Sequence, residues 1–248
     1  MIPKNHPRAK SLLVREKLVA GYEKGLVAKE GLIAHGRGEA FDYLLGEKTS
    51  KNAEKAIKTA ALSLISAKSP VISVNGNVAS LCAKEIIQLA KIINAKIEVN
   101  LFYANQKRKK RIARILKING AKKVLGVDSK SAKKIPKLDS ARRIVDASGI
   151  YSADVILVPL EDGDRTLMLK KFGKKVITFD LNPLSRTAQT ADITIVDDIS
   201  RGMRKLIQIC RKLKKSKVKQ HNSFDNKRNL VEAVKEIKKN LEKRAIHA

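Results

Sequence analysis

Hydrophobic positions recur along this chain with two different periods. Apolar residues spaced three or four apart predict amphipathic helices, and short runs of β-branched residues predict buried strands. The helical windows are residues 8–29, 50–68, 79–95, 107–121 and 167–173, followed by a largely basic helical end that breaks at 216–229. The strand windows lie in the segments 70–76, 96–102, 122–128, 153–166, 174–187 and 191–199.

Strands that alternate with helices indicate an α/β fold, with a Rossmann-like, mostly parallel sheet and crossover helices. We expect an N-terminal helical segment packed on the core at residues 1–70, the Rossmann-like core at 71–205 and a basic helical C-terminal tail at 206–248. Residues 129–149 are punctuated by Ser, Lys and Pro, so we expect them to form a loop.

The net charge of the chain restricts the kinds of partner that we expect. It carries 53 Lys and Arg residues against 24 Asp and Glu residues, a formal net charge of +29. This excess predicts anionic partners: nucleic acid, an acidic surface or phosphorylated small molecules. Its 2 cysteines are too few for a disulfide framework. No apolar run approaches the roughly 20 residues of a membrane span, so we expect a protein of the cytoplasm with no membrane partner.

Polar residues follow four of the predicted strands, which is where open parallel sheets bind ligands. These runs are Asn75-Gly76-Asn77, Glu161 to Thr166, Asp180 to Thr187 and Asp197-Asp198. Each run alone also suits a plain turn or a helix cap, but four on one edge of a sheet favour a site. The usual phosphate-binding patterns are absent, because the chain has no G-x-x-x-x-G-K-[ST] and no G-x-G-x-x-G after a strand.

Several long blocks of the sequence resemble one family. They are "HPRAKSLLVREKLVAGYEKGLVAKEGLIAHGRGEAFDYLLGE", "SVNGNVA", "IEVNLF", "VPLEDGDRT" and "DLNPLSRTAQTADITIVDDI". In these blocks the chain is similar to archaeal phosphopantothenate synthetase, also called 4-phosphopantoate–β-alanine ligase. The resemblance is loose over residues 105–150, and it does not extend into the Lys-rich end.

The resemblance implies a cytoplasmic homodimer that joins 4-phosphopantoate to β-alanine in coenzyme A synthesis. It also implies ATP as a substrate, an acyl-adenylate intermediate, release of AMP and diphosphate, and Mg²⁺. The family's ATP-binding positions carry over onto Arg15, Arg37, Asp180, Leu181, Asn182, Arg186, Thr187, Asp198 and Ile199. The family pattern assigns no residues to 4-phosphopantoate or β-alanine in this chain.

The segment "IAHGRGEAF" places Arg37 between two glycines. We expect Gly36 and Gly38 to form a sharp turn that brings the Arg37 guanidinium close to phosphate oxygens. A reaction that gathers so many negative charges is catalysed mainly by positive groups fixed in advance. The candidate catalytic residues are His35, Arg37 and Arg165, with His35 either stabilising the adenylate or only holding the loop.

Four further residues are candidates for binding the substrates: Asn75, Asn77, Asp162 and Asp164. The two asparagines offer neutral donors for the pantoate hydroxyl or carboxylate. The two aspartates either hold Mg²⁺, orient Arg165 or cap a turn, and the sequence does not decide between these roles or identify metal ligands.

The competing interpretation is a basic nucleic-acid-binding α/β protein. The net charge and the basic runs at 106–117 and 210–219 favour it. Aromatic residues make up only 4% of the chain and do not alternate with the basic runs, which argues against a base-stacking surface. We therefore expect small, phosphorylated substrates and no nucleic-acid partner.

Overall fold

A five-stranded parallel sheet forms the centre of the molecule, with strand order β2-β1-β5-β6-β7. The structure is a computed structural model that describes residues 2–3, 5–6, 8–128, 130–138, 140–216 and 223–246. The strands are β1 (Val71–Val74), β2 (Lys96–Val99), β5 (Val155–Leu157), β6 (Lys175–Phe179) and β7 (Ile193–Ile195). The predicted α/β, Rossmann-like architecture with a parallel sheet is confirmed.

The direction in which successive strands are added to the sheet reverses once. The chain first moves from β1 outward to β2, and it then returns to the other side of β1 and continues outward through β5, β6 and β7. In such doubly wound sheets the ligand site lies outside the carboxyl ends of the strands at the reversal point. Here that point is between β1 and β5.

Helices cover both faces of the sheet. On one face α3 (Lys51–Ser66), α4 (Gly76–Ile93) and α8 (Ile199–Ser216) bury apolar side chains against the strands. On the other face lie α6 (Gly163–Lys171) and a small antiparallel hairpin of β3 (Ala132–Lys134) and β4 (Ile144–Asp146). Because water reaches neither face, the strands are made almost entirely of buried apolar residues, as parallel strands require.

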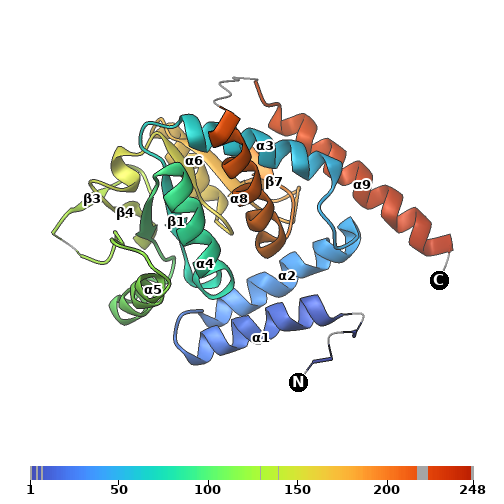
Figure 1. The fold of residues 1–248 in the computed structure, drawn as a ribbon, viewed down its shortest axis with the longest axis horizontal. Coiled ribbons are helices and arrows are strands. Elements are labelled where there is room, and N and C mark those ends of the chain that lie inside the picture. Colours follow the sequence, from blue (N-terminus) through green and yellow to red (C-terminus); the bar gives the residue numbers. More distant parts are fainter. Residues whose placement is uncertain are drawn as a thin grey trace.

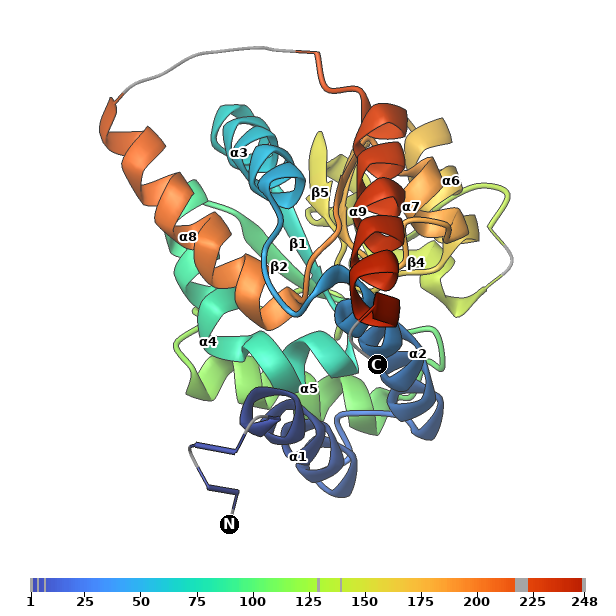
Figure 2. The same ribbon diagram turned by 90° about the vertical axis from the view of Figure 1, so that its right-hand side faces the viewer.

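Two N-terminal helices, α1 (Ala9–Glu23) and α2 (Lys29–Leu45), lie together at one end of the molecule (Figures 1 and 2). The α5 helix (Gln106–Ile118) packs near them, beside β2 and α4. This is the end at which the strands finish, because α4, α6, α7 (Arg186–Thr190) and α8 all begin there. Short 3₁₀ turns at Ala141–Arg143 and Ile150–Ser152 flank β4.

The expected start of α3 is confirmed in detail. The Ser50 side chain accepts a hydrogen bond from the Ala53 amide at 2.9 Å, so it caps the helix. The predicted apolar face of that helix, Ala53, Ile57, Ala60, Ala61 and Leu64, is buried in the core. None of the helices in the described part of the chain has the length and hydrophobicity of a membrane span.

Two local predictions between residues 122 and 149 are wrong. Residues 122–128 do not form a strand, because only Leu125 pairs with the sheet, through one bridge to Glu98. Residues 129–149 are not simply a loop, since they contain the β3–β4 hairpin. The β3 residues are all exposed, so the segment lacks the apolar alternation that predicts a strand.

The basic C-terminal end packs more closely than its composition suggests. Leu230 and Ala233 of α9 (Asn226–Ile246) are 7% and 2% exposed, and they meet Leu45 and Leu181 in a small apolar cluster. The Asn229 amide also donates to the Thr194 carbonyl at 2.8 Å. This helix therefore holds α2 and the β6–α7 connection in place, which matters for the site described next. The division into segments at residues 70 and 205 stays a prediction.

Candidate functional site

A cavity of about 810 Å³ opens at the carboxyl ends of the strands. Four helices begin at its wall, each directly after a strand of the sheet: α4 after β1, α6 after β5, α7 after β6 and α8 after β7. The first turn of a helix presents unpaired backbone N–H groups and the positive end of its dipole. The longer helices α4, α6 and α8 all point such an end at one space, which makes it suited to anions.

Side-chain caps fix each of these helix starts. Asn75 accepts from the Val78 amide at 3.1 Å, and Asp162 accepts from the Arg165 amide at 2.8 Å. Ser185 and Asp198 cap the other two helices, at 2.9 Å and 3.0 Å. The polar runs that the sequence places after each strand are therefore helix caps, and they also line the cavity.

Asn75 has a second structural role at the reversal point of the sheet. Its amide nitrogen donates to the carbonyls of Pro159 and Leu160, at 3.2 Å and 3.0 Å, and so ties the end of β1 to the end of β5. The amide of Asn77 donates to the Gly31 carbonyl of α2 at 2.8 Å. Both asparagines line the cavity as expected, but their amide groups already bind the protein itself.

The α2 helix forms part of the cavity wall and is held there by ion pairs. Arg201 of α8 donates to Asp42 of α2 at 2.7 Å and to Asp197 at 2.8 Å. Burial lowers the pKa of Arg201, but these two carboxylates raise it by more, so the ion pairs stabilise the charged guanidinium. Asn240 of α9 adds a hydrogen bond to the Leu44 carbonyl at 3.0 Å.

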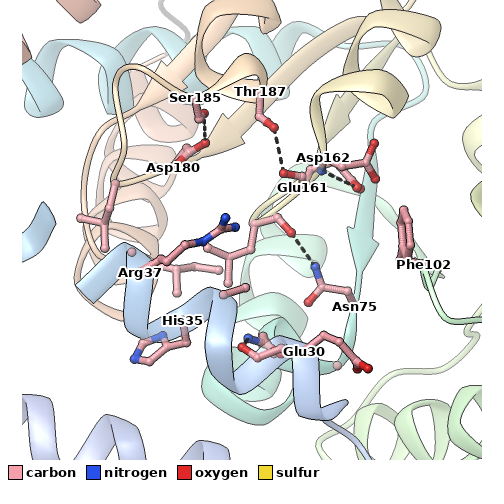
Figure 3. Close-up of a pocket in the computed structure, with 18 of the residues that line it drawn as sticks. Glu30, His35, Arg37, Asn75, Phe102, Glu161, Asp162, Asp180, Ser185 and Thr187 are labelled. Carbon is pink, nitrogen blue, oxygen red and sulfur yellow. Dashed lines mark hydrogen bonds between the residues drawn. The ribbon is translucent and has the colours of Figure 1, made fainter. Parts of the chain in front are cut away.

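The predicted glycine turn around Arg37 is wrong. Gly36 and Gly38 lie inside α2, which runs without interruption from Lys29 to Leu45. Arg37 nevertheless lines the cavity, because the helix itself presents this side chain to it, and its contact with phosphate stays a prediction. Figure 3 shows Arg37 reaching from α2 into the space between Asp180 and Asn75. A β-carbon at Gly36 would have no atom within 4 Å, so nothing in the packing requires glycine there.

Asp180 occupies the end of β6, facing Arg37. It accepts hydrogen bonds from the Ser185 hydroxyl and from the Asn182 amide, the latter at 2.9 Å. Burial raises the pKa of Asp180, while these hydrogen bonds and the charge of Arg37 act in the opposite direction. The neighbouring His35 lines the cavity, and burial lowers its pKa, so its imidazole is neutral at pH 7.

A buried charge network lies at the opposite side of the cavity. Glu161, whose side chain is 2% exposed, forms ion pairs with both Arg142 and Arg165. Arg142 also lies 3.3 Å from a carboxylate oxygen of Asp162, and its guanidinium stands 5.7 Å from the centre of the Phe102 ring. Burial lowers the pKa of Arg142 to about 9 and that of Arg165 to about 10, so both stay positive at pH 7.

We call the part of the cavity lined by Asp180, Asn182, Arg186 and Asp198 the β6–β7 end, and the part lined by Phe102, Tyr103, Arg108 and Arg142 the β2 end. Figure 3 shows the two ends on opposite sides of the view, with Asp180 at one side and Phe102 at the other. Asn75 and Leu160 lie between them, at the reversal point of the sheet.

The cavity brings together most of the residues predicted from the sequence. Those that line it are His35, Arg37, Asn75, Asn77, Asp162, Asp180, Leu181, Asn182, Arg186, Thr187, Asp198 and Ile199. Three predicted residues do not line it. Arg165 is fully buried behind Glu161, Asp164 is exposed and paired with Arg186, and Arg15 on α1 is paired with Glu39 at 2.9 Å. Arg15 nevertheless lies near enough to His35 for its charge to lower the pKa of that imidazole.

Sequence reasoning missed the β2 end of the cavity. Arg108 was assigned only to a basic helix and Arg142 to a loop, and both line the cavity together with Phe102 and Tyr103. Glu161 directly precedes Asp162 in the connection after β5. Its position after a strand is the one feature of the sequence that indicates a role in the site. Among the described residues, no group of three or more His, Cys, Asp or Glu side chains is arranged to hold a metal ion.

Comparison with known proteins agrees with this geometry. The family described as "Phosphopantothenate/pantothenate synthetase" matches residues 52–240. A protein of Thermococcus kodakarensis named 4-phosphopantoate–β-alanine ligase is 50% identical over 245 residues, covering 97% of this chain and 93% of that protein. Proteins of the same name from Thermococcus onnurineus and Methanosarcina mazei are 55% and 48% identical, covering 86% and 97% of this chain and 81% and 95% of their own lengths. The chain belongs to the phosphopantothenate/pantothenate synthetase family.

Proposed function

We propose that this protein is an ATP-dependent ligase that joins 4-phosphopantoate to β-alanine and forms 4'-phosphopantothenate, AMP and diphosphate. The observation that carries the proposal is the convergence of the N-termini of α4, α6 and α8 with the guanidinium groups of Arg37 and Arg186 on one cavity. Both ATP and 4-phosphopantoate carry phosphate, and this cavity concentrates the groups that bind it. The names of the relatives support the choice of substrates.

The proposed reaction proceeds through an acyl-adenylate. A carboxylate oxygen of 4-phosphopantoate attacks the α-phosphorus of ATP, and the bond to the bridging oxygen breaks so that diphosphate leaves with the electron pair. The uncharged amine of β-alanine then attacks the acyl carbon, AMP leaves with the oxygen that joined it to the acyl group, and the new amide loses a proton. Both steps build negative charge on oxygen, which fixed positive groups stabilise.

We assign ATP to the β6–β7 end of the cavity. Asp180 stands directly after a strand, where an acidic side chain commonly accepts from ribose hydroxyls. Arg37 and Arg186 supply two guanidinium groups to phosphate oxygens, and the start of α8 at Ile199 supplies backbone donors. His35, neutral at pH 7, acts as a hydrogen-bonding group and not as a cation. The role of Arg15 in ATP binding stays a prediction.

Mg²⁺ is expected with the ATP phosphates, and it typically needs only one or two protein carboxylates beside them. Asp162 lines the cavity, but its Oδ2 atom is buried and lies 3.3 Å from the Arg142 guanidinium, so this carboxylate does not offer Mg²⁺ a free oxygen.

We further propose that the protein is a homodimer that pairs through the α1 side. Leu13, Val19 and Tyr22 on α1 are 47%, 48% and 38% exposed, and Ile33 on α2 is 71% exposed. Large apolar side chains that are exposed on neighbouring helices, as α1 and α2 are, commonly mark an interface. Sedimentation equilibrium with the variants Leu13→Ser and Leu167→Ser separates this surface from that around an exposed leucine on α6.

The experiment that tests the function is a direct search for the products. Purified protein is incubated with ATP, 4-phosphopantoate and β-alanine, and the mixture is resolved by liquid chromatography and mass spectrometry. We expect 4'-phosphopantothenate and AMP in equal amounts, and no amide product when β-alanine or ATP is omitted. Absence of product from folded protein, or product without ATP, would contradict the proposal.

A further inference from the structure

The C-terminal helix α9 lies directly behind the wall of the β6–β7 end. None of the described residues of α9 lines the cavity. Leu230 and Ala233 of this helix instead pack in the small apolar cluster that contains Leu181 and, at its edge, Phe41. Leu181 and Phe41 also line the cavity, so each of them faces the cavity on one side and the α9 cluster on the other. The α9 helix therefore supports the cavity wall without forming part of it.

Hydrogen bonds join the start of α9 to α7, the helix that begins with Arg186. The Asn226 amide donates to the carbonyls of Ala188 and Ala191, at 2.9 Å in both cases. These carbonyls lie at the end of α7, where the helix itself offers them no donor. With 5 residues, α7 is too short to be stable alone, so contacts of this kind hold it in place. Through α7, they fix the backbone that carries Arg186.

The other end of α9 holds the end of α2, the helix that carries Arg37. The Asn240 side-chain amide donates to the Leu44 carbonyl at 3.0 Å, in the last turn of α2. Because carbonyls of a last turn have no partner within their own helix, this bond satisfies one of them. Figure 2 shows α9 beside both α7 and α2. One helix thus contacts the two elements that bring Arg37 and Arg186 to the cavity.

The separation of these two guanidinium groups matters for binding one nucleotide. Arg37 and Arg186 are exposed and belong to distant segments of the chain, so their relative position depends on tertiary contacts. Two charged groups bind one triphosphate tightly only when they are already spaced for it, because each group that must be ordered on binding costs affinity. Contacts that fix α2 and α7 relative to each other supply this spacing in advance.

We propose that α9 is a positioning element of the ATP subsite, which sets the separation of Arg37 and Arg186 and thereby the affinity for the nucleotide. The inference rests on the proposed function, since it concerns the binding of the ATP used in that reaction. A helix that only covered the core would contribute to stability, and its contribution to ATP binding would be independent of Arg186. Positioning couples α9 to Arg186, so the two roles differ in a measurable way.

The test measures the dissociation constant of α,β-methylene-ATP by isothermal titration calorimetry, with thermal unfolding as a check on each variant. Asn240→Ala removes the bond to α2. Its control is Asn119→Ala, which removes a similar amide–carbonyl bond of 2.8 Å at the end of α5. Leu230→Ala weakens the apolar cluster, and its control is Leu89→Ala at a fully buried position of α4. Asn240 is only half-buried, so its variant carries the test if Leu230→Ala does not fold.

We expect Asn240→Ala and Leu230→Ala to raise the dissociation constant roughly 3- to 10-fold, the effect of ordering one or two more side chains on binding. Leu230→Met refills the cluster and should restore the affinity. Both controls should stay within about twofold of wild type, because their positions are distant from the nucleotide and independent of it. This holds even where Leu89→Ala lowers the unfolding midpoint as much as Leu230→Ala does.

The variant Arg186→Gln provides a double-mutant cycle. Because α9 acts through Arg186, Leu230→Ala should weaken nucleotide binding less in the Arg186→Gln protein than in the wild type. Unchanged affinity in Asn240→Ala and Leu230→Ala, an equal loss in the controls, or full additivity with Arg186→Gln would overturn the inference. Wild-type protein that binds no nucleotide would instead refute the proposed function, and the inference with it.

Discussion

The two ends of the cavity are built in different ways. At the β6–β7 end, Asp180, Asn182 and Ser185 belong to one short connection and hydrogen-bond to one another. At the β2 end, Arg108, Arg142 and Glu161 come from three distant segments, and Glu161 and Arg142 are almost fully buried. The first end is local in sequence and partly open. The second is assembled only by the tertiary fold, around charges that water barely reaches.

This difference predicts which part of the site is fragile. A side chain of the β6–β7 end can change without leaving a buried charge alone, so its loss should affect catalysis more than folding. A member of the buried network cannot be removed so simply, because its partner is left charged and desolvated. Four predictions, in order of decreasing effect, test this contrast.

Glu161→Ala should destabilise the protein strongly. It leaves Arg142 and Arg165 without their shared carboxylate, and breaking a buried ion pair on one side costs about 3–5 kcal/mol. The measurement is urea unfolding followed by circular dichroism. The control is Asp164→Ala, which removes an exposed partner of Arg186 and should cost less than about 1 kcal/mol. Equal stability of the two variants would show that the buried network contributes no more than a surface pair.

Arg37→Lys should lose catalysis and keep the fold. Lysine retains the charge but lacks the planar fork that contacts two phosphate oxygens, so the barrier should rise by about 2–4 kcal/mol, roughly a hundredfold or more in rate. Arg37 is exposed on a helix, so its replacement leaves no buried partner. The measurement is kcat and the KM for ATP, with the unfolding midpoint as the folding check. Near wild-type kinetics would mean that Arg37 does not bind the nucleotide.

Glu98 should make stability depend on pH near neutrality. It is fully buried behind the β2 end, where it accepts from the amides of Asp146 and Ile150 at 2.9 Å and 2.7 Å. Burial raises the pKa of Glu98 from 4.5 to about 7, although both hydrogen bonds act against the rise. The folded protein therefore holds this proton more tightly than the unfolded chain does. Its contribution is fully present below pH 4.5 and is lost as the pH rises through 7.

The variant Glu98→Gln isolates this effect, because its amide does not titrate. Between pH 5 and 7, the free energy of unfolding of the wild type should fall relative to that of the variant, by on the order of 2 kcal/mol. Urea unfolding at several pH values across this interval measures the difference. If the free energies of unfolding of the two proteins depend on pH in the same way, Glu98 is ionised over this whole interval. That result would contradict the raised pKa of Glu98.

Gly36→Ala should stabilise the protein slightly. Alanine in a helix interior is favoured over glycine by about 0.5–1 kcal/mol, and a β-carbon at this position meets no other atom. Gly163→Ala is the opposite case, since its β-carbon would lie 2.5 Å from Cβ of Arg186 and force α6 away from α7. Thermal unfolding compares the two. A clear loss of stability in Gly36→Ala would show that position 36 requires glycine, as the predicted turn would.

The sequence predicted the fold and the β6–β7 end because both depend on local patterns. Buried β-branched runs marked the strands, and polar residues after them marked the caps, as Asp180 and Ser185 show. The glycines beside Arg37 led to the wrong prediction of a turn, because a helix can contain glycine where packing against the rest of the protein stabilises that helix. The sequence around Arg142 contains no pattern that predicts a site, since the role of Arg142 depends on contacts with Glu161 and Phe102. Long-range assembly of this kind has no local signature.

The most direct test of the central claim follows oxygen atoms through the reaction. 4-Phosphopantoate labelled with ¹⁸O in its carboxylate is converted with ATP and β-alanine, and the nucleotide and phosphate products are analysed by mass spectrometry. An acyl-adenylate transfers one labelled oxygen to the phosphate of AMP, and we expect this result. Label in orthophosphate, accompanied by ADP, would show that the carboxylate attacks the γ-phosphate, and it would contradict the proposed chemistry of the cavity.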